Sequence, residues 1–465
     1  MTSNDLHVQS TPLGLKWRSS YVFTTVVVSI GVATDLLIYT IIVPVVPFQL
    51  EALGYDSISA RAGWLLFAYS GGLVLSTIPT AMFTERYNMR QLPLIFGLVV
   101  LIGSQILFME APNYAVMCVA RALQGIGSTM VWVVGLALLC DCTPEQHIAK
   151  QLGFTMASVS VGMLAGPPIG GALYKRWGWR APFIFGVIIC VVDFIGRLLI
   201  IERKDALKYG HDPAAIPEPA SAAPATDEEK SNDAGTTTAE STVVATPSPS
   251  TKTRLSLTGV LVRLSKSPRA VSALITTLLY GLIYTAQEPT LPLHLQSVWG
   301  LDSEKVGLIY LASVIPTLFS GPISGYYCDR VGPEYIACVC FILGIPWWAV
   351  LMVKRSLALF IAAFALASFF VSGIIPPIMA ELATVARQDD GIGYGHVYGA
   401  FNLAYGIGTT VGPIIGGQIY NVHADGWAII AGLSAGIVFM SFVLTFFYTG
   451  DRPLGGRLLA KLHNK

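Results

Sequence analysis

Residues 34–47 read TDLLIYTIIVPVVP, and this stretch decides the fold class because it places a carboxylate, Asp35, inside a long apolar run. The run extends over residues 21–48, and ~20 apolar residues are enough to cross the hydrocarbon core of a bilayer. A charged side chain at the centre of a membrane helix costs about 2.5 kcal/mol or more, so intramembrane acids mark substrate or proton pathways. Asp35 is therefore the first candidate functional residue.

The composition of the whole chain also indicates a membrane protein. Of the 465 residues, 53% are hydrophobic and only 12% are charged, whereas soluble proteins carry about 25% charged residues. The formal net charge of +1 gives no electrostatic reason to expect a nucleic-acid partner. Cys140 and Cys142, like Cys338 and Cys340, are two residues apart and would face different sides of a helix. We therefore expect no metal site.

About twelve segments are long and apolar enough to span a bilayer, which predicts an all-α membrane protein. The predicted spans are 21–48, 61–84, 92–110, 114–140, 151–174, 181–201, 270–296, 305–328, 335–353, 357–385, 394–420 and 427–449. These spans divide the chain into an N-terminal tail (1–20), a first six-helix bundle (21–201), a central loop (202–268), a second six-helix bundle (269–449) and a C-terminal tail (450–465).

The central loop and the basic residues predict the orientation of the chain. Residues 213–251 are rich in Ala, Pro, Ser and Thr, so we expect a largely disordered segment. Lysine and arginine gather on the side of the termini and the central loop, which predicts that this side is cytoplasmic. The other side receives fewer basic residues: Arg61, Lys175, Arg176, Arg180, Lys305, Lys354 and Arg355.

The two halves of the chain repeat each other at a spacing of about 245 residues. VPVVPFQL at 43–50 matches EPTLPLHL at 288–295, and TER at 84–86 matches CDR at 328–330. VGMLAGPPIGG at 161–171 matches GTTVGPIIGG at 408–417. Three matches at one spacing predict a duplicated six-helix unit, the architecture of two-halved transporters.

These residues resemble the major facilitator superfamily of secondary transporters. GYYCDRVG at 325–332 is similar to the family's loop motif between the second and third helix of a half, and AMFTERYN at 81–88 is its degenerate copy. RALQGIG at 121–127 matches the fourth-helix motif, and GMLAGPPIGG at 162–171 matches the fifth-helix motif of the drug:proton antiporter branch. The resemblance implies twelve transmembrane helices in two pseudo-symmetric six-helix bundles.

The motifs also imply gating residues. Acid–arginine pairs in the loops are expected to bridge helix ends in one state and to release in the other. The small residues of the fifth helix are expected to permit close helix contact and to seal the transporter against leak. The residues assigned to these roles are Glu85, Arg86, Gly162, Gly166, Pro167, Gly170, Gly171, Gly325, Asp329, Arg330, Gly332, Gly412 and Pro413.

Within this branch the chain resembles the vesicular amine transporters and their fungal relatives. TDLLIYTIIVPVVP, RALQGIGS, GPPIGGALY, AQEPTLP and PPIMAEL carry the likeness. Asp35 and Glu288 match the acids of the first and seventh helices in those transporters. Positions that carry a lysine or an acid in the second, tenth and eleventh helices hold Ser70, Thr384 and Asn402 here.

Asp35 and Glu288 are the principal candidates for proton coupling and substrate binding. Both lie on the first helix of a half, where helices of this architecture line a central cavity. In the repeat, Glu288 matches Val43, eight residues beyond Asp35, so we expect it ~12 Å closer to the outer face. Two acids at different heights can pass a proton along a path. The alternative is that each merely hydrogen-bonds a neighbouring helix.

Arg121 and Glu381 complete the proton-coupling set, each with an alternative. The motif match assigns Arg121 a coupling role, but it lies near the end of its span and could snorkel. Glu381 is either a third protonatable site or a cap at the cytoplasmic end. Asp193 and Arg197 are four residues apart, and we expect a structural i,i+4 pair. The further substrate-binding candidates are Tyr39, Trp132, Tyr284, Gln287, Tyr310, Tyr398, Phe401, Asn402 and Tyr405.

The expected function is secondary transport, not enzyme catalysis. GLSAG at 432–436 fits a serine-hydrolase pattern but lies inside a predicted span, and no phosphate-binding loop is present. We expect a proton-coupled antiporter that exports a drug, toxin, secondary metabolite or amine by alternating access. It would use the proton gradient and no cofactor, as a monomer in the plasma membrane or an organelle membrane. Transport of an organic acid and a non-transporting sensor are the alternatives.

Overall fold

The computed structural model is built from helices and describes residues 12–87, 90–144, 148–214, 262–388, 394–451 and 453–463. Within these ranges, eleven helical segments are long and apolar enough to cross a membrane. The twelfth predicted span, 394–420, forms α18 (Tyr394–Val422), a glycine-rich helix of 29 residues. Its glycines lower its mean hydropathy without shortening it. The predicted all-α membrane fold is confirmed.

The first half of the chain contains α1 to α10. Its elements are α1 (Leu15–Arg18), α2 (Tyr21–Ile41), α3 (Val46–Ala52), α4 (Ile58–Tyr87), α5 (Gln91–Met109), α6 (Tyr114–Thr129), the π-helical turn η1 (Met130–Val134), α7 (Gly135–Cys142), α8 (Ile148–Trp177), α9 (Arg180–Leu199) and α10 (Arg203–Leu207). Side-chain caps mark two of the starts: Ser20 accepts a hydrogen bond from the amide of Val22, and Asn113 accepts one from Val116.

The second half contains α12 to α20. Its elements are α12 (Pro268–Ala286), α13 (Leu291–Trp299), α14 (Ser303–Val331), α15 (Pro333–Val350), α16 (Leu357–Ser372), α17 (Ile375–Gln388), α18, α19 (Gly426–Tyr448) and α20 (Leu454–His463). Pro268 opens α12 at a position where its missing N–H is not needed, and Ser267 caps the same helix.

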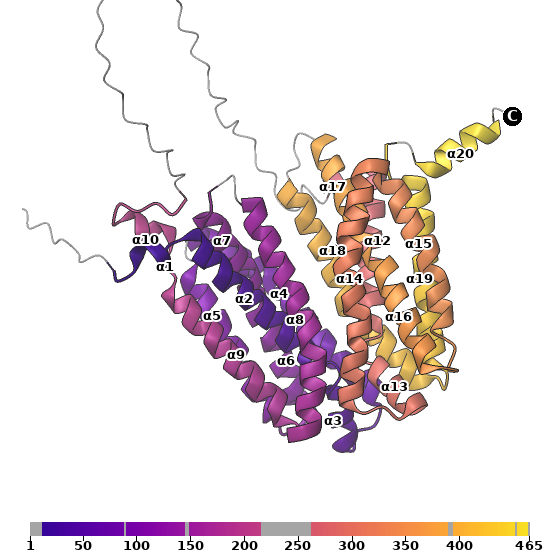
Figure 1. The fold of residues 1–465 in the computed structure, drawn as a ribbon, viewed down its shortest axis with the longest axis horizontal. Helices are drawn as coiled ribbons and strands as arrows, with labels where there is room; N and C mark the ends of the chain where they lie inside the picture. The colour runs from indigo at the N-terminus through magenta and orange to yellow at the C-terminus, as the bar shows by residue number, and fades with distance from the viewer. Residues whose placement is uncertain are drawn as a thin grey trace, which may run out of the picture.

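The helices form two bundles that follow the two halves of the chain (Figure 1). The bundles converge at the end that contains α3 and α13 and diverge toward the end that contains α7 and α17. The helices α1, α10 and α20 lie at the diverging end, which we call the terminal face, and α3 and α13 mark the opposite face.

The first membrane helix of each half is broken at the same place. In the first half α2 ends at Ile41 and α3 begins at Val46, and in the second half α12 ends at Ala286 and α13 begins at Leu291. Each break contains one proline, Pro44 or Pro289, and each following helix starts next to another. Proline removes a backbone donor and clashes with the preceding turn, so both helices stop there.

Glycines allow the first and fifth helices of each half to pack backbone to backbone. A Cβ atom on Gly170 of α8 would lie 1.9 Å from the carbonyl oxygen of Ile41. At the equivalent place in the second half, a Cβ atom on Gly416 of α18 would lie 1.8 Å from the carbonyl oxygen of Ala286. Both contacts are shorter than any side chain permits, so only glycine fits.

The two halves are joined at the opposite face by a pair of pseudo-symmetric contacts. The Ser59 hydroxyl donates to the carbonyl oxygen of Gly417 at 3.0 Å, joining α4 to α18. The Ser303 hydroxyl donates to that of Gly171 at 3.1 Å, joining α14 to α8. Lys175 also bridges from α8 to Glu304 of α14 at 2.8 Å. These contacts close this face of the molecule.

Short helices form in the described parts of the segments predicted to be tails and central loop. The C-terminal tail forms α20, held by Arg457, which pairs with Glu334 at 2.9 Å. The start of the predicted loop forms α10, where Arg203 pairs with Asp212 at 2.8 Å. These ion pairs supply stabilisation that composition does not reveal. The segment predicted to be disordered, 213–251, lies outside the described ranges from residue 215 onward, so that prediction stays untested.

Candidate functional site

Asp35 is buried on α2 and is held by uncharged donors. Its Oδ2 atom accepts a hydrogen bond from the Ser128 hydroxyl at 2.6 Å and another from the indole N–H of Trp132 at 2.8 Å. Its Oδ1 atom is buried without a hydrogen-bond partner. Trp132 lies in the π-helical turn η1, and such turns frequently occur at functional sites.

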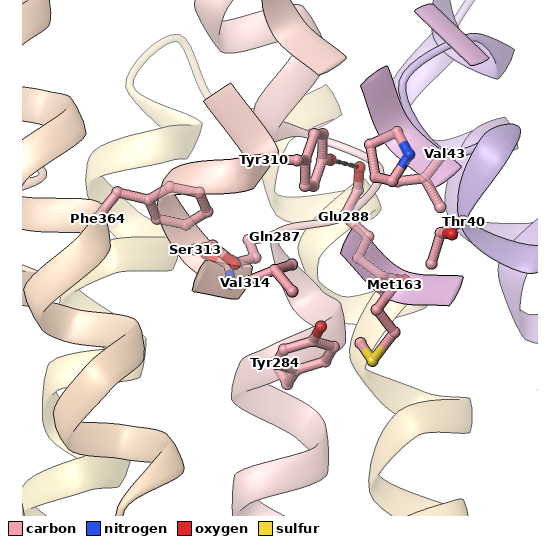
Figure 2. Close-up of a pocket in the computed structure, with 11 residues that line it drawn as sticks. Thr40, Val43, Met163, Tyr284, Gln287, Glu288, Tyr310, Ser313, Val314 and Phe364 are labelled. Carbon is pink, nitrogen blue, oxygen red and sulfur yellow. Dashed lines mark hydrogen bonds between the residues drawn. The ribbon is translucent and has the colours of Figure 1, made fainter. Parts of the chain in front are cut away.

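Glu288 lies at the break between α12 and α13 and lines a cavity at the seam between the halves (Figure 2). Its Oε2 atom accepts a hydrogen bond from the Tyr39 hydroxyl of the first half at 2.6 Å. The Tyr310 hydroxyl donates to its backbone carbonyl at 3.3 Å. The cavity lining consists of Thr40, Val43, Met163, Pro167, Tyr284, Gln287, Glu288, Tyr310, Ser313, Val314 and Phe364.

A chain of side chains links the two acids. The Tyr39 ring packs against the Tyr69 ring with centroids 4.7 Å apart. The Tyr69 hydroxyl donates at 2.9 Å to Ser128, which in turn donates to Asp35. Glu288 therefore connects to Asp35 through two hydrogen-bonded segments that meet at the tilted contact between the Tyr39 and Tyr69 rings.

Arg121 is fully buried beside this chain, so it does not snorkel to a membrane surface. Its guanidinium carbon lies 6.0 Å from the Tyr39 ring centroid, 5.8 Å from that of Tyr69 and 5.3 Å from that of Phe108. Arg121 lines a second, small cavity together with Glu288, and its Nε and Nη2 atoms have no hydrogen-bond partner. Glu288 thus lines both cavities, and the positively charged side chain of Arg121 lines the second one.

Asp35 and Glu288 differ from the other buried acids because neither forms an ion pair within the described ranges. Among the described residues, the buried carboxylates are those of Asp35, Asp193, Glu202, Glu288, Glu334 and Glu381. Four of them form ion pairs: Asp193 with Arg197, Glu202 with Lys204, Glu334 with Arg457 and Glu381 with Arg269. None of the ion pairs within the described ranges includes Asp35 or Glu288.

Glu381 does not join the central acids and belongs to a charged cluster at the terminal face. Its carboxylate lies 2.5 Å from the Arg269 guanidinium at the start of α12 and accepts a hydrogen bond from the amide of Gly450 at 3.0 Å. Arg269 also binds Asp451 at 2.6 Å, and this hydrogen bond lowers the pKa of Asp451 below its usual value. Glu381 lies where the cap alternative places it, and its role as a third protonatable site stays untested.

The remaining substrate-binding candidates divide into two groups. Tyr284, Gln287 and Tyr310 line the cavity, whereas Phe401 and Tyr405 stack on each other beside Tyr280. Asn402 is exposed and lies outside the cavity lining, which contains no described residue of α18. The side chain of Tyr398 lies outside the described part of the chain.

The chain resembles known proteins in both its sequence and its fold. The sequence profile of the Major Facilitator Superfamily matches residues 28–270 and 273–462. The chain belongs to the Major Facilitator Superfamily. Its members are transporters, so the chain is a membrane transporter and not an enzyme.

Relatives within the superfamily come from fungi and animals. A protein named "MFS-type transporter ppzB" from Metarhizium rileyi is 26% identical, with 96% of this chain and 99% of the relative covered. A protein named "Probable vesicular acetylcholine transporter-B" from Danio rerio is 27% identical, with 86% of this chain and 74% of the relative covered. The predicted resemblance to vesicular amine transporters and fungal relatives is confirmed.

Solved structures share the superfamily fold. A bacterial homologue of the human lysosomal transporter Spinster, in an inward-facing and occupied conformation, has a TM-score of 0.67 at 14% identity, covering 94% of this chain and 97% of that one. The human organic anion transporter MFSD10 has a TM-score of 0.58 at 16% identity, covering 91% and 99%.

The superfamily's loop motif lies at the terminal end of α14. Asp329 and Arg330 are exposed, and the Arg330 guanidinium lies 4.2 Å from the centroid of the Tyr326 ring. Neither residue forms an ion pair within the described ranges, and their gating role stays a prediction. Gly332 ends the helix with a φ of 108°. The side chains of Glu85 and Arg86 lie outside the described residues.

The fifth-helix motif performs two kinds of packing in this transporter fold. Gly162, Gly166 and Gly170 face α2, and a Cβ atom on any of them would lie 2.4 Å or less from an atom of that helix. Pro167 and Gly171 face α14 of the other half. In the second half Gly412 contacts α12, and the Pro413 carbonyl oxygen would lie 2.3 Å from a Cβ atom on Gly63.

Tyr69 and Ser128 are site residues that sequence reasoning missed. Both are polar groups within apolar helices, but nothing in their local sequence shows that they face Asp35. A signal was present for Tyr39, because LIYT occurs identically at 37–40 and 282–285 and places Tyr39 and Tyr284 in equivalent positions. Within the described ranges, no cluster of His, Cys, Asp and Glu side chains could hold a metal ion.

Proposed function

We propose that the protein is a proton-coupled antiporter that exports a small organic compound by alternating access. The observation that carries this proposal is the state of Asp35 and Glu288, which are buried at the centre of the molecule and have only uncharged hydrogen-bond donors. A buried acid without a basic partner gains or loses its proton more readily than one fixed in an ion pair. Each can therefore exchange a proton for a solute.

The conformation supports alternating access. Contacts between the halves close the opposite face, and the bundles diverge toward the terminal face (Figure 1). We propose that the terminal face is cytoplasmic, as the distribution of Lys and Arg predicts. In this arrangement solute would enter the cavity from the cytoplasm and leave after the opposite face opens. We expect a monomer, in the plasma membrane in preference to an organelle membrane.

A cationic or hydrophobic solute fits the cavity best. Glu288 is surrounded by the rings of Tyr284 and Tyr310, and aromatic faces attract cations. The relative named for acetylcholine transport agrees with a cationic solute. Transport of an organic anion is the second candidate, because Arg121 presents unpaired guanidinium nitrogens to the neighbouring cavity.

Proteoliposomes with a pH-sensitive dye inside provide the test. Amines, organic acids and apolar drugs would be added separately under an imposed proton gradient, to wild type, Asp35→Asn and Glu288→Gln. We expect one solute class to drive proton movement in the wild type and at least about tenfold less in either variant, because each loses a proton-binding group. Asp212→Asn, which changes an acid at the terminal face, is the control and should behave as wild type.

Two outcomes would overturn parts of the proposal. If solute crosses without proton movement and both variants match the wild type, the antiporter function is wrong and facilitated diffusion replaces it. If only organic acids drive proton movement, the substrate is the anion that Arg121 favours.

A further inference from the structure

A second charged pair lies deep in the first half, behind Asp35. Asp193 and Arg197 of α9 have side chains that are 0% exposed. The Nε atom of Arg197 reaches the two Asp193 oxygens at 3.2 and 3.1 Å, while its Nη1 and Nη2 atoms are buried without a partner. A structural arginine–carboxylate pair normally uses two parallel N–H bonds from the guanidinium fork. Arg197 instead holds its partner through one nitrogen and keeps its other donors unused.

The unused nitrogens point at the helix that carries Asp35. A Cβ atom on Gly31 of α2 would lie 1.8 Å from Nη2 of Arg197 and 2.9 Å from Oδ2 of Asp193. The guanidinium group therefore occupies the space that any side chain at position 31 would need. Asp35 follows one turn later, ~6 Å along the same helix. It lies within electrostatic range of both Asp193 and Arg197.

Packing alone does not account for this pair. A buried ion pair is often no more stable than apolar side chains of the same volume, and unpaired buried donors cost further free energy. Asp35 has the complementary defect, because its Oδ1 atom is buried without a donor. The unpaired acceptor belongs to Asp35, and the unpaired donors include the nitrogen beside Gly31, one turn earlier on α2.

Other titratable groups around Asp35 do not supply a positive charge. Titratable groups near Asp35 include Tyr69 of α4. They also include Cys190, Asp193 and Arg197, all of α9. Ser128 and Trp132, which approach from α6 and η1, are neutral. Of these groups only Arg197 is a cation.

We propose that the Asp193–Arg197 pair is a positioning device for Asp35, in which Arg197 is shared between the two carboxylates. While Asp35 carries its proton, Arg197 remains on Asp193. When the proton leaves, the free Nη donors stabilise the Asp35 carboxylate, directly after a small side-chain movement or through one bridging water molecule. The importance of this device for transport rests on the proposed proton coupling, but its effect on Asp35 does not.

Infrared titration tests the proposal without measuring transport. The carboxylic-acid band of Asp35, identified by its loss in Asp35→Asn, would be followed against pH in purified protein in lipid. Arg197→Gln removes the cation, so Asp35 should keep its proton to a pH about one unit higher. Asp193→Asn releases Arg197 to Asp35, so the half-protonation pH should fall by a similar amount. Opposite shifts distinguish electrostatic positioning from a structural role.

Further variants keep the test decisive. The double variant Asp193→Asn/Arg197→Gln leaves no unpaired charge buried at this place, so it should fold even if a single variant does not. Its half-protonation pH should lie between those of the single variants. Arg197→Lys keeps the charge and should stay close to wild type. The double variant Asp212→Asn/Arg203→Gln, which removes an ion pair at the terminal face, is the control and should cause no shift.

The outcomes are distinct from those of the proposed function. Absence of any shift in folded variants would overturn the positioning role and leave the pair as a structural one. If the infrared shifts occur but solute moves without protons, the proposed function fails and the coupling of Arg197 to Asp35 stands.

Discussion

Tyr39 and Tyr284 occupy equivalent positions in the two halves but make different contacts. The Tyr39 hydroxyl crosses the seam and donates to Glu288 at 2.6 Å. The Tyr284 hydroxyl lies in the same cavity, and no hydrogen bond from it is present among the described residues (Figure 2). One member of a duplicated pair has therefore acquired a polar partner that the other lacks. The asymmetry arises from Glu288, whose equivalent in the first half is Val43.

Replacing Tyr39 by phenylalanine should impair proton coupling without disturbing the fold. The variant removes a hydrogen bond to an ionisable group, worth about 1.5–3 kcal/mol, and the Tyr39–Tyr69 ring contact remains. We expect roughly a 10- to 100-fold loss of proton-driven transport in proteoliposomes. Tyr284→Phe is the matched control and should lose much less, because its hydroxyl donates no hydrogen bond among the described residues and phenylalanine keeps the ring. Equal losses in the two variants would show that the seam bond has no special role.

Some site residues could be predicted from sequence and others could not. The burial of Asp35 and Glu288 was predictable because both acids lie inside apolar spans, and their function in proton coupling stays a prediction. Tyr69 and Ser128 were not, since their contact with Asp35 depends on how α4 and α6 are rotated about their axes. The complete burial of Arg121 could not be predicted, because its position along the span does not show which neighbours cover it.

The close approach of helix pairs depends on glycines at equivalent heights in the two halves. In α18, Gly408, Gly412 and Gly416 face α12, where a Cβ atom on each would lie between 1.8 and 2.3 Å from an atom of α12. In α19, Gly436 has no atom within 4 Å of its expected Cβ position. Glycine is therefore required for contact in one helix and not in the other.

Substitution of these glycines by alanine should have opposite effects on stability. Gly416→Ala forces α18 away from the backbone of α12, and overpacking of this kind costs about 1–3 kcal/mol. Gly436→Ala should be neutral or stabilising by up to about 1 kcal/mol, because alanine is the better helix former. Thermal unfolding of the purified protein in detergent would measure both. A Gly416→Ala variant as stable as wild type would contradict the packing argument.

Helix positions were predictable, but breaks within helices were less so. Hydropathy locates the long apolar segments, because lipid imposes both length and composition. It does not reveal that the span 357–385 divides into α16 and α17 around Gly373 and Ile374, or that η1 interrupts the span 114–140. Short helices such as α10 and α20 depend on specific ion pairs, which composition does not encode.

In the whole molecule, the duplication produces two equivalent contacts between the halves at the opposite face, which we call seals. Ser59 binds Gly417 between α4 and α18, and Ser303 binds Gly171 between α14 and α8. The repeat found in the sequence predicted two similar bundles, but not which helices of one bundle meet those of the other. Because the two seals are related by the repeat, a symmetric movement of the bundles would open both together.

Locking the opposite face should stop transport if this face opens during each cycle. Lys175 of α8 and Glu304 of α14 meet across the two halves at 2.8 Å. In a variant without the seven native cysteines, Lys175→Cys and Glu304→Cys would be joined by a short, thiol-cleavable bifunctional reagent. We expect transport to fall to background after cross-linking and to recover after reduction, because the bundles could no longer separate there.

A cross-link within one half provides the matched control for this experiment. Lys354 and Asp425 meet at 3.0 Å, and both belong to the second half. Asp425 lies two residues before Trp427, which stacks on His294 of α13 at the opposite face. Cross-linking of Lys354→Cys to Asp425→Cys should therefore leave most of the transport activity, since the two bundles stay free to move against each other. If the cross-link between Lys175→Cys and Glu304→Cys also leaves transport intact, the solute does not leave by separation of α8 and α14. The exit would then have to open between α4 and α18, and the two seals would act independently despite their symmetry.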